Sequence, residues 1–464
     1  MSPNPLEKRQ RKGNLTRSRC LLLWRKSPVS EKRIFAIVGL PVLHSRSPQI
    51  YQQLFRIENR ELIYTRLAVQ RISEAISVMD DLGISGYNIT APFKKNVLRH
   101  LNEVSEPARK MCAVNTVVRK DGKLVGYNTD IDGVIGALQS NGIELSGNSA
   151  VVIGAGGAGR AATFGLLKTG AKVILVNRSV EKAEKIAKSF GCEFAPMENL
   201  ADVVKNAKII VSALPAGVDV IADEWLTPNH VLLDANYHSE ILKNKAGKRG
   251  ATFIGGESWL IHQAIPAYRH FTGSQKKMKI PKIIDFNSSM KNIALVGFMG
   301  VGKSFVGKSL AKLLGWKYID TDDEIVEKTG KSISQIFSEY GESEFREMER
   351  EVIQSVVRQK CAVISCGGGV VLDQVNRRQL IDNSLTVWIY APVKTALSRI
   401  DLTSRPLLSR NVSAVELEAE KIFRKRRDLY AEVSDLVVIN KRWSSQKTAE
   451  LIYEEVCSAF GHLW

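Results

Sequence analysis

The sequence predicts an α/β protein with two separate halves, each built around a parallel sheet. β-rich runs alternate with helical patterns along most of the chain, which is typical of strand–helix–strand units. One glycine-rich turn follows a strand at residues 154–159, and a different glycine-rich loop follows a strand at residues 297–304. With 464 residues the chain is too long for one compact core, so we expect two or three domains.

The expected elements follow one another in a regular order. The strands predicted in the first half are residues 33–41, 63–69, 149–156, 172–177, 208–214 and 230–236, with helices at 159–169 and 181–189. The alternation stops at 274–290, a lysine- and serine-rich stretch that we interpret as a flexible linker that tethers the two halves. A second α/β pattern starts at Asn292 and continues to the C-terminus.

The net charge of +18 raises the question of a nucleic-acid partner. Residues 1–33 hold ten Lys or Arg and two Glu, and residues 274–292 hold five Lys and one Asp, so these two stretches supply 12 of the 18 charges. The rest of the chain is only mildly basic. We therefore expect no nucleic-acid partner and assign the remaining charge to small anionic ligands.

Composition also bears on the compartment. No apolar run approaches the roughly 18 residues needed to cross a bilayer, so no membrane association is expected. The six cysteines form no C-x-x-C pair, which favours a reducing, cytoplasmic environment. Residues 1–32 lack periodicity and are predicted to be a disordered basic arm; an organellar targeting peptide is the less favoured interpretation.

The turn at 154–159 predicts a dinucleotide site. It reads Gly154-Ala155-Gly156-Gly157-Ala158-Gly159 between a strand and a helix, so backbone N–H groups and the helix N-terminus face a pyrophosphate. After the next strand come Asn177, Arg178 and Ser179, where an NAD enzyme carries an acid. A guanidinium there suits a 2′-phosphate, so NADP(H) is favoured.

Three polar clusters surround this turn, at residues 44–48, 88–94 and 113–116, the last followed by Asn128-Thr129-Asp130. One interpretation is that they only cap helices and shape loops. The other is a site for a small polyhydroxylated acid, in which Lys94 and Asp130 pass a proton to or from an alcohol oxygen during hydride transfer.

The ordered set HSRSP, NITAPFK, AVNT, NTD, GAGGAG, NRS and GESWLIHQ resembles shikimate dehydrogenase over residues 33–273. The resemblance implies a substrate domain at 33–132 plus 254–273 and a Rossmann NADP domain at 133–253. It makes Lys94 and Asp130 the catalytic pair. The residues that it implies for substrate binding are Ser45 and Ser47 on the carboxylate, Asn88, Thr90, Asn115 and Gln263 on the hydroxyls, and Tyr237 near the carboxylate.

This chain departs from that family at two places. Tyr237-His238-Ser239 stands where the family has Tyr-x-Pro, and Ser258-Trp259-Leu260 stands where a Gly-Met-Leu stretch abuts the nicotinamide. We expect that Trp259 can still present an apolar face to the nicotinamide ring.

In the second half, residues 297–304 form a complete G-x-x-x-x-G-K-S phosphate loop after the strand NIALV. The N–H groups around Gly300, Val301 and Gly302 cradle phosphates, Lys303 reaches the β- and γ-phosphates, and Ser304 ligates Mg²⁺. Asp320 and Asp322 follow at a strand end, either as helix-capping acids or as a metal partner and a proton acceptor.

The later motifs are Gly341 to Glu349, Gly367-Gly368-Gly369, Arg405-Pro and Arg426-Arg427. Together with the phosphate loop they resemble shikimate kinase over 291 to about 457, which implies a P-loop domain like that of nucleoside monophosphate kinases at 291–464. By this resemblance Asp322 orients the attacking hydroxyl, Asp320 holds Mg²⁺ through water, and Arg405 belongs to a lid over ATP. Shikimate is then held by Arg346, Gly368, Gly369 and Arg426.

The two resemblances share one metabolite, and we therefore expect a bifunctional enzyme that makes shikimate and then phosphorylates it. Two alternatives remain open: a quinate/shikimate dehydrogenase of broader specificity, or a regulatory binding protein with one inactive half. The intact Lys94, Asp130, Lys303 and Asp322 argue against the second. A homo-oligomer is compatible with the sequence, which does not decide it.

Overall fold

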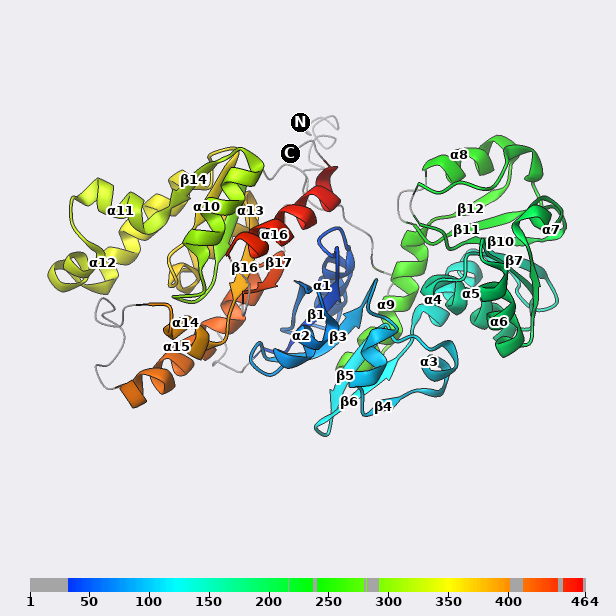
Figure 1. Cartoon of the computed structure of the whole chain (residues 1–464), viewed down its shortest axis with the longest axis horizontal. Helices are drawn as coiled ribbons and strands as arrows, with labels where there is room; N and C mark the ends of the chain where they lie inside the picture. Colours follow the sequence, from blue (N-terminus) through cyan, green and yellow to red (C-terminus); the bar gives the residue numbers. More distant parts are fainter. Residues whose placement is uncertain are drawn as a thin grey trace, which may run out of the picture.

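The computed structural model describes residues 32–215, 217–236, 240–278, 281, 292–400, 412–440 and 445–461. Almost all of the predicted basic arm and most of the predicted linker lie outside these residues. The described part is arranged around two sheets (Figure 1).

The smaller sheet has six parallel strands in the order β12-β11-β10-β7-β8-β9. Its strands are β7 (Ser149–Ile153), β8 (Lys172–Val176), β9 (Glu193–Ala195), β10 (Ile209–Ser212), β11 (Val231–Asp234) and β12 (Thr252–Ile254). Its helices are α4 (Asp130–Gln139), α5 (Gly157–Lys168), α6 (Val180–Phe190), α7 (Leu200–Asn206) and α8 (Glu240–Arg249). Because the order reverses direction beside β7, this is the doubly wound dinucleotide fold, with its crevice at the strands' carboxyl ends.

The larger sheet has eleven strands in the order β14-β15-β13-β16-β17-β2-β1-β3-β5-β6-β4. The first half of the chain supplies β1 (Ile34–Gly39), β2 (Ile63–Ala68), β3 (Ile84–Ile89), β4 (Glu103–Val104), β5 (Thr116–Lys120) and β6 (Lys123–Tyr127). The helices of this part are α1 (Ser47–Ile57), α2 (Ile72–Ser77), α3 (Glu106–Met111) and α9 (Gly256–Thr272). Helix α9 returns from the smaller sheet and packs on α1 and α4.

The second half supplies the other five strands, all parallel. They are β13 (Asn292–Val296), β14 (Lys317–Asp320), β15 (Ala362–Ser365), β16 (Leu385–Tyr390) and β17 (Leu436–Ile439). The helices of this half are α10 (Lys303–Leu314), α11 (Thr321–Thr329), α12 (Ile333–Val356), α13 (Gln374–Asn383), α14 (Val393–Leu397), α15 (Val412–Val433) and α16 (Ser445–Phe460). Strand β13 leads into α10 through the phosphate loop, as the sequence predicts.

The larger sheet contains antiparallel strands, whereas the sequence pattern predicted a parallel sheet. β5 pairs antiparallel with both β3 and β6. The β5–β6 hairpin turns at Asp121-Gly122, both of which have positive φ, at 49° and 77°. An Asp-Gly pair between β-rich runs is a strong hairpin signal, so this hairpin could have been recognised in the sequence.

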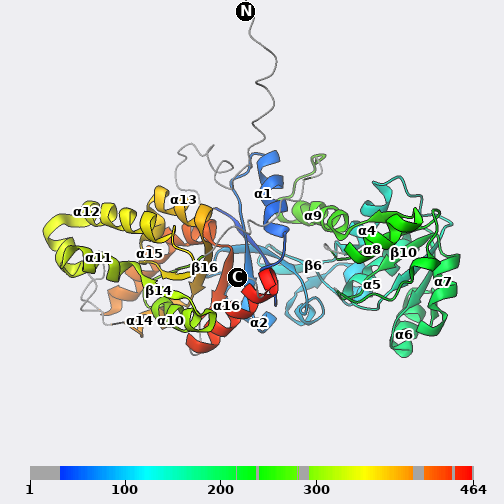
Figure 2. The ribbon, with the colours of Figure 1, turned by 90° about the horizontal axis from the view of Figure 1, so that it is seen from above.

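The two halves are joined edge to edge, a contact that the sequence analysis, with its flexible linker, did not predict. β17 of the second half runs parallel to β2 of the first, with Val437 opposite Leu67 and Val438 opposite Ala68. Both strands would otherwise leave a row of backbone hydrogen-bonding groups unpaired at a sheet edge. Figures 1 and 2 show the second half and the β1–β3 region side by side in both views.

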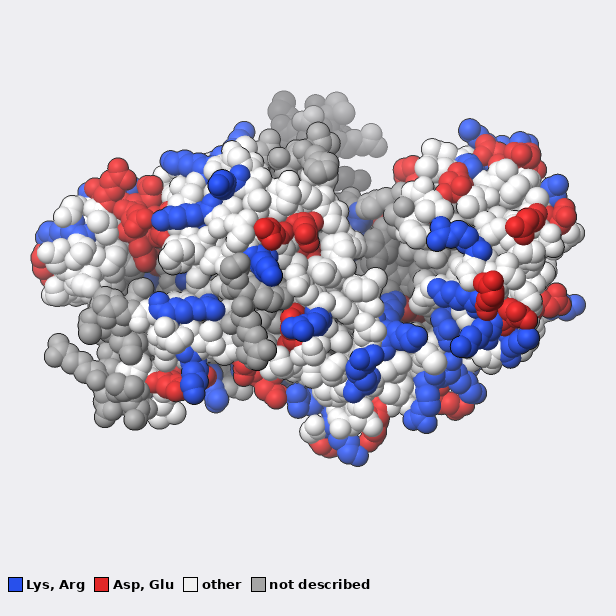
Figure 3. Space-filling model, in the orientation of Figure 1, with Lys and Arg blue, Asp and Glu red and all other residues white. Residues whose placement is uncertain are grey.

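Charged side chains of both signs are interspersed on the face shown in Figure 3. Acidic side chains gather over α11, which carries Asp322, Asp323, Glu324 and Glu327. No helix within the described ranges is long and apolar enough to span a membrane.

Candidate active sites

One cavity collects most of the side chains that the sequence analysis assigned to the first substrate site. These are Ser45, Ser47, Asn88, Thr90, Lys94, Asn115 and Gln263. They come from the loop after β1, the end of β3, the start of β5 and helix α9, because the carboxyl ends of parallel strands meet at one sheet edge. Tyr51 also lines the cavity, and the sequence analysis missed it because it lies within the apolar pattern of α1.

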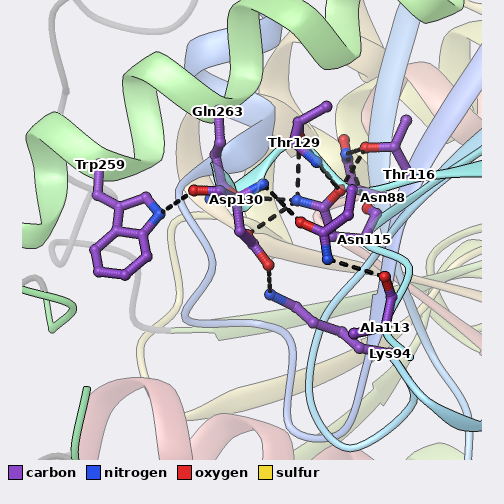
Figure 4. Close-up of polar contacts among 10 residues, drawn as sticks. Asn88, Lys94, Ala113, Asn115, Thr116, Thr129, Asp130, Trp259 and Gln263 are labelled. Atoms are coloured by element: carbon purple, nitrogen blue, oxygen red, sulfur yellow. Dashed lines mark hydrogen bonds and ion pairs between the residues drawn. The ribbon is translucent and has the colours of Figure 1, made fainter. Parts of the chain in front are cut away.

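Lys94 and Asp130 form an ion pair at this cavity, with 2.6 Å between Lys94 Nζ and Asp130 Oδ2 (Figure 4). The Asp130 side chain is 4% exposed, whereas that of Lys94 is 23% exposed. Asp130 is the first residue of α4, and its backbone N–H donates to Asn128 Oδ1 at 3.0 Å. The lysine is therefore held by a buried carboxylate while it still reaches the cavity.

Asn115 connects this pair to the rest of the site. Its Nδ2 donates to Asp130 Oδ1 at 2.9 Å and to Gln263 Oε1 at 3.1 Å. Its Oδ1 accepts the backbone N–H of Thr129 at 2.9 Å, and its backbone oxygen accepts from Asn88 Nδ2 at 3.3 Å (Figure 4). Each polar group fixes the orientation of the next, which preorganises the wall that meets a polyhydroxylated ligand.

Trp259 packs against helix α4, and its expected contact with the nicotinamide ring remains a prediction. Its side chain is buried against α4, and its indole N–H donates to the backbone oxygen of Asp130 at 3.0 Å. Gly133 of α4 makes room for the indole, since any Cβ there would collide with the ring. The residue therefore supports the Lys94–Asp130 pair from behind. Tyr237 and Arg405, two other expected site residues, lie outside the described residues.

The dinucleotide turn has the expected backbone. Gly154 has φ +109°, and a Cβ on Gly159 would collide with the backbone oxygen of Gly154. No atom lies within 4 Å of a Cβ built on Gly156, so this face is open to a pyrophosphate. A Cβ on Gly157 would lie 3.5 Å from Lys94 Cδ, which places the turn next to the Lys94–Asp130 pair.

The three residues that follow β8 have different roles. Asn177 Oδ1 accepts the backbone N–H of Ala155 at 3.1 Å and so shapes the turn. Ser179 caps α6 by accepting the backbone N–H of Lys182. Arg178 is exposed between them, beside the dinucleotide turn. Of the three, its guanidinium is the group best placed for a 2′-phosphate.

In the second half, the phosphate loop 297–304 wraps around Lys303. Lys303 Nζ donates to the backbone oxygens of Gly297 at 2.9 Å and Phe298 at 3.0 Å. Gly302 has φ +94° and directly precedes α10, so the helix N-terminus faces the loop. The loop places the expected phosphate-binding residues Gly300, Val301, Gly302, Lys303 and Ser304 together.

Ser304 and Asp320 lie together as a metal site requires. Ser304 Oγ donates to Asp320 Oδ2 at 2.9 Å, and Tyr318 OH donates to the same oxygen at 2.8 Å. A hydroxyl and one carboxylate suit Mg²⁺ that takes its other ligands from water and phosphate. The described residues contain no group of three or more His, Cys, Asp or Glu that could hold a metal by themselves. Asp320 also accepts the backbone N–H of Asp322 at 3.1 Å, so its two proposed roles coexist.

Asp322 and Arg346 meet at the glycine run of the second half. A Cβ on Gly367 would lie 2.8 Å from Asp322 Oδ1 and 3.1 Å from Glu349 Oε1, and one on Gly369 would collide with the Arg346 guanidinium. Only glycine allows these carboxylates and this guanidinium to approach the backbone so closely. Motifs that are far apart along the chain therefore form one compact site.

Glu349 is a site residue to which the sequence analysis gave no role. Its carboxylate pairs with Arg346 Nη1 at 2.9 Å, and burial raises its pKa to about 7 although Arg346 opposes the shift. The i, i+3 spacing of the two residues in α12 is the signal that could have revealed the pair. On the other side of the site, Gly368 O accepts from Arg426 Nη1 at 3.0 Å and from Tyr430 OH at 2.5 Å.

The comparisons with known proteins agree with this division. The shikimate dehydrogenase substrate binding domain model matches residues 37–117, the shikimate / quinate 5-dehydrogenase model matches 137–232, and the shikimate kinase model matches 299–457. The NADP(+) shikimate dehydrogenase of Carboxydothermus hydrogenoformans is 32% identical over 268 residues, covering 54% of this chain and 96% of that protein. The chain belongs to the shikimate dehydrogenase family.

Other dehydrogenases of this family give the same result. The Pyrococcus furiosus protein is 34% identical over 257 residues, covering 54% of this chain and 94% of that protein. The crystal structure of the Aquifex aeolicus enzyme aligns with a TM-score of 0.51 at 31% identity, covering 54% of this chain and 96% of that one. The remaining half carries a shikimate kinase domain, so the chain is a bifunctional enzyme of the shikimate pathway. The expected fold class and both enzyme types are confirmed.

Proposed function

We propose that this chain reduces 3-dehydroshikimate to shikimate with NADPH and then transfers the γ-phosphoryl group of ATP to shikimate, giving shikimate 3-phosphate. The observation that carries the proposal is the Lys94–Asp130 pair at the cavity that Ser45, Ser47 and the amide side chains line. The same chain holds a complete phosphate loop beside Asp322 and Arg346. One metabolite is therefore the product of the first site and the substrate of the second.

In the reduction, NADPH held by the turn at 154–159 and by Arg178 would supply the hydride. Lys94 donates a proton to the carbonyl oxygen, and Asp130 stabilises and orients the charged lysine before transfer. Ser45 and Ser47 hold the ring carboxylate, while Asn88, Thr90, Asn115 and Gln263 bind the ring oxygens. Tyr237 is assigned near the carboxylate from the family pattern alone.

In the phosphorylation, Asp322 accepts the proton of the attacking hydroxyl. Arg346 and Arg426 hold the shikimate carboxylate beside the backbone of Gly368 and Gly369. Lys303 stabilises charge on the transferred phosphoryl group. Mg²⁺ bound at Ser304 and Asp320 would neutralise charge on the phosphates, and Arg405 is assigned to the lid from the family pattern.

The domain limits 33–132 plus 254–273, 133–253 and 291–464 remain predictions, and the three family matches fall within them. The cytoplasmic location and the oligomeric state also remain predictions. A quinate-preferring dehydrogenase is the nearer alternative, because one matching family model covers both shikimate and quinate enzymes. A kinase domain for shikimate in the same chain favours shikimate.

A coupled assay tests the proposal directly. Purified protein is incubated with 3-dehydroshikimate, NADPH and ATP·Mg²⁺, and we expect shikimate 3-phosphate by mass spectrometry together with equimolar NADPH oxidation. Without ATP the product should stop at shikimate, and without NADPH none should form. Quinate offered with NADP⁺ should react far more slowly than shikimate. Absence of shikimate 3-phosphate, or a preference for quinate, would contradict the proposal.

The choice of NADP rests on Arg178, and Arg178→Asp tests it. A carboxylate there repels the 2′-phosphate, so we expect the KM for NADP⁺ to rise by roughly tenfold or more with the KM for NAD⁺ little changed. The matched control is Lys185→Asp, which makes the same charge change at an exposed position further along α6. An unaltered preference in Arg178→Asp would place the 2′-phosphate elsewhere.

A further inference from the structure

A side chain of the kinase half reaches the loop between β1 and α1 in the dehydrogenase half. Glu455 lies in α16 and is fully buried. Its carboxylate accepts the backbone N–H of Val42 at 2.8 and 3.1 Å and that of Leu43 at 2.7 Å. Figure 1 shows α16 against the segment that carries this loop. An anionic group of one half thus satisfies two backbone donors of the other.

A second buried charge holds the other end of the same loop. Arg66 in β2 donates to the backbone oxygen of Ser45 from Nε at 2.9 Å and from Nη2 at 2.6 Å. Its Nη1 donates to the backbone oxygen of Asp435, just before β17 of the kinase half, at 3.2 Å. Between the two ends, the N–H of Ser45 donates to Val42 O at 3.0 Å. Both ends of the loop are therefore held by buried charged side chains. Glu455 belongs to the kinase half, and Arg66 also binds its backbone.

Burying a carboxylate is costly unless its partners compensate. Burial raises the pKa of Glu455, and the two backbone N–H groups and the charge of Arg66 oppose that shift. An apolar side chain could pack α16 against the loop without this cost. The carboxylate therefore indicates a specific requirement for an acceptor of the Val42 and Leu43 N–H groups.

The loop leads directly into Ser45 and Ser47, whose side chains line the dehydrogenase cavity. We propose that Glu455 is a positioning residue of the dehydrogenase: by holding the N–H groups of Val42 and Leu43, it places these two hydroxyls for the substrate carboxylate. This inference rests on the proposed function, which assigns the serines to that carboxylate. The kinase half then completes the dehydrogenase substrate site without touching the substrate.

The test is Glu455→Gln in the full chain, assayed as NADP⁺ reduction by shikimate without ATP. Glutamine keeps the shape but sets an NH₂ donor against a backbone donor and removes the charge facing Arg66. We expect the KM for shikimate to rise about tenfold, with kcat and the KM for NADP⁺ within about twofold of wild type, since ground-state binding is what the loop supplies. The kinase constants for ATP and shikimate should be unchanged.

Glu454→Gln is the matched control, because it makes the same charge change at the exposed neighbouring position of α16. An unchanged KM for shikimate in Glu455→Gln overturns the inference. A parallel loss of both activities and of melting temperature also overturns it, since Glu455 would then only hold the halves together. If Glu455→Gln is insoluble, Glu455→Asp is measured by the same criteria. A wild type without shikimate-dependent NADP⁺ reduction would refute the proposed function instead.

Discussion

Replacing Lys94 with alanine is expected to lower kcat for shikimate-dependent NADP⁺ reduction by about 10³-fold, the loss typical of a missing general acid–base group. Lys94 Nζ lies 2.6 Å from a carboxylate that is almost fully buried, at the wall of the substrate cavity. Alanine removes the group that exchanges a proton with the substrate oxygen and leaves Asp130 without its cationic partner. Initial rates at saturating shikimate and NADP⁺ measure the loss.

The neighbouring Lys95 supplies the control for this experiment. Lys95 is exposed, so Lys95→Ala makes the same side-chain change one residue away and should retain activity. Kinase activity should persist in Lys94→Ala, because its groups come from other elements of the fold. Equal loss of both activities in Lys94→Ala would contradict the assignment of two separate sites.

Replacing Asp322 with asparagine is expected to lower kinase kcat by about 10²–10⁴-fold while ATP binding is retained. Asp322 lies in the first turn of α11, and its Oδ1 lies against Gly367 of the glycine run. Asparagine fills the same space but cannot accept the hydroxyl proton. A coupled ADP-release assay measures turnover, and titration with a non-hydrolysable ATP analogue measures binding.

Asp323, the next residue in α11, is exposed and provides a matched substitution. Asp323→Asn should leave kinase turnover within about twofold of wild type, since exposed changes away from a site have small effects. The dehydrogenase should be unaffected in both variants. Near-normal phosphorylation by Asp322→Asn would mean that another group accepts the proton.

The sequence by itself determined the features that are local along the chain. The turn at Gly154–Gly159 and the phosphate loop 297–304 each need glycines, a preceding strand and a following helix, all within a few residues. Both were therefore predicted with their elements. The short polar clusters were recognised as well, because each lies on one loop and keeps the order of a known family. The hairpin at Asp121-Gly122 was local too and was overlooked.

Only the tertiary structure decided which distant groups meet. Lys94 and Asp130 are 36 residues apart, and only the fold brings their side chains together as an ion pair. Nothing in the sequence links Glu455 to the dehydrogenase or Arg66 to the kinase half, since their partners lie hundreds of residues away along the chain. The same holds for β17 and β2: each would be an edge strand within its own half, and the sequence does not show that these two edges pair with each other. Because of this pairing, the two halves share one continuous sheet and are not connected by the linker alone.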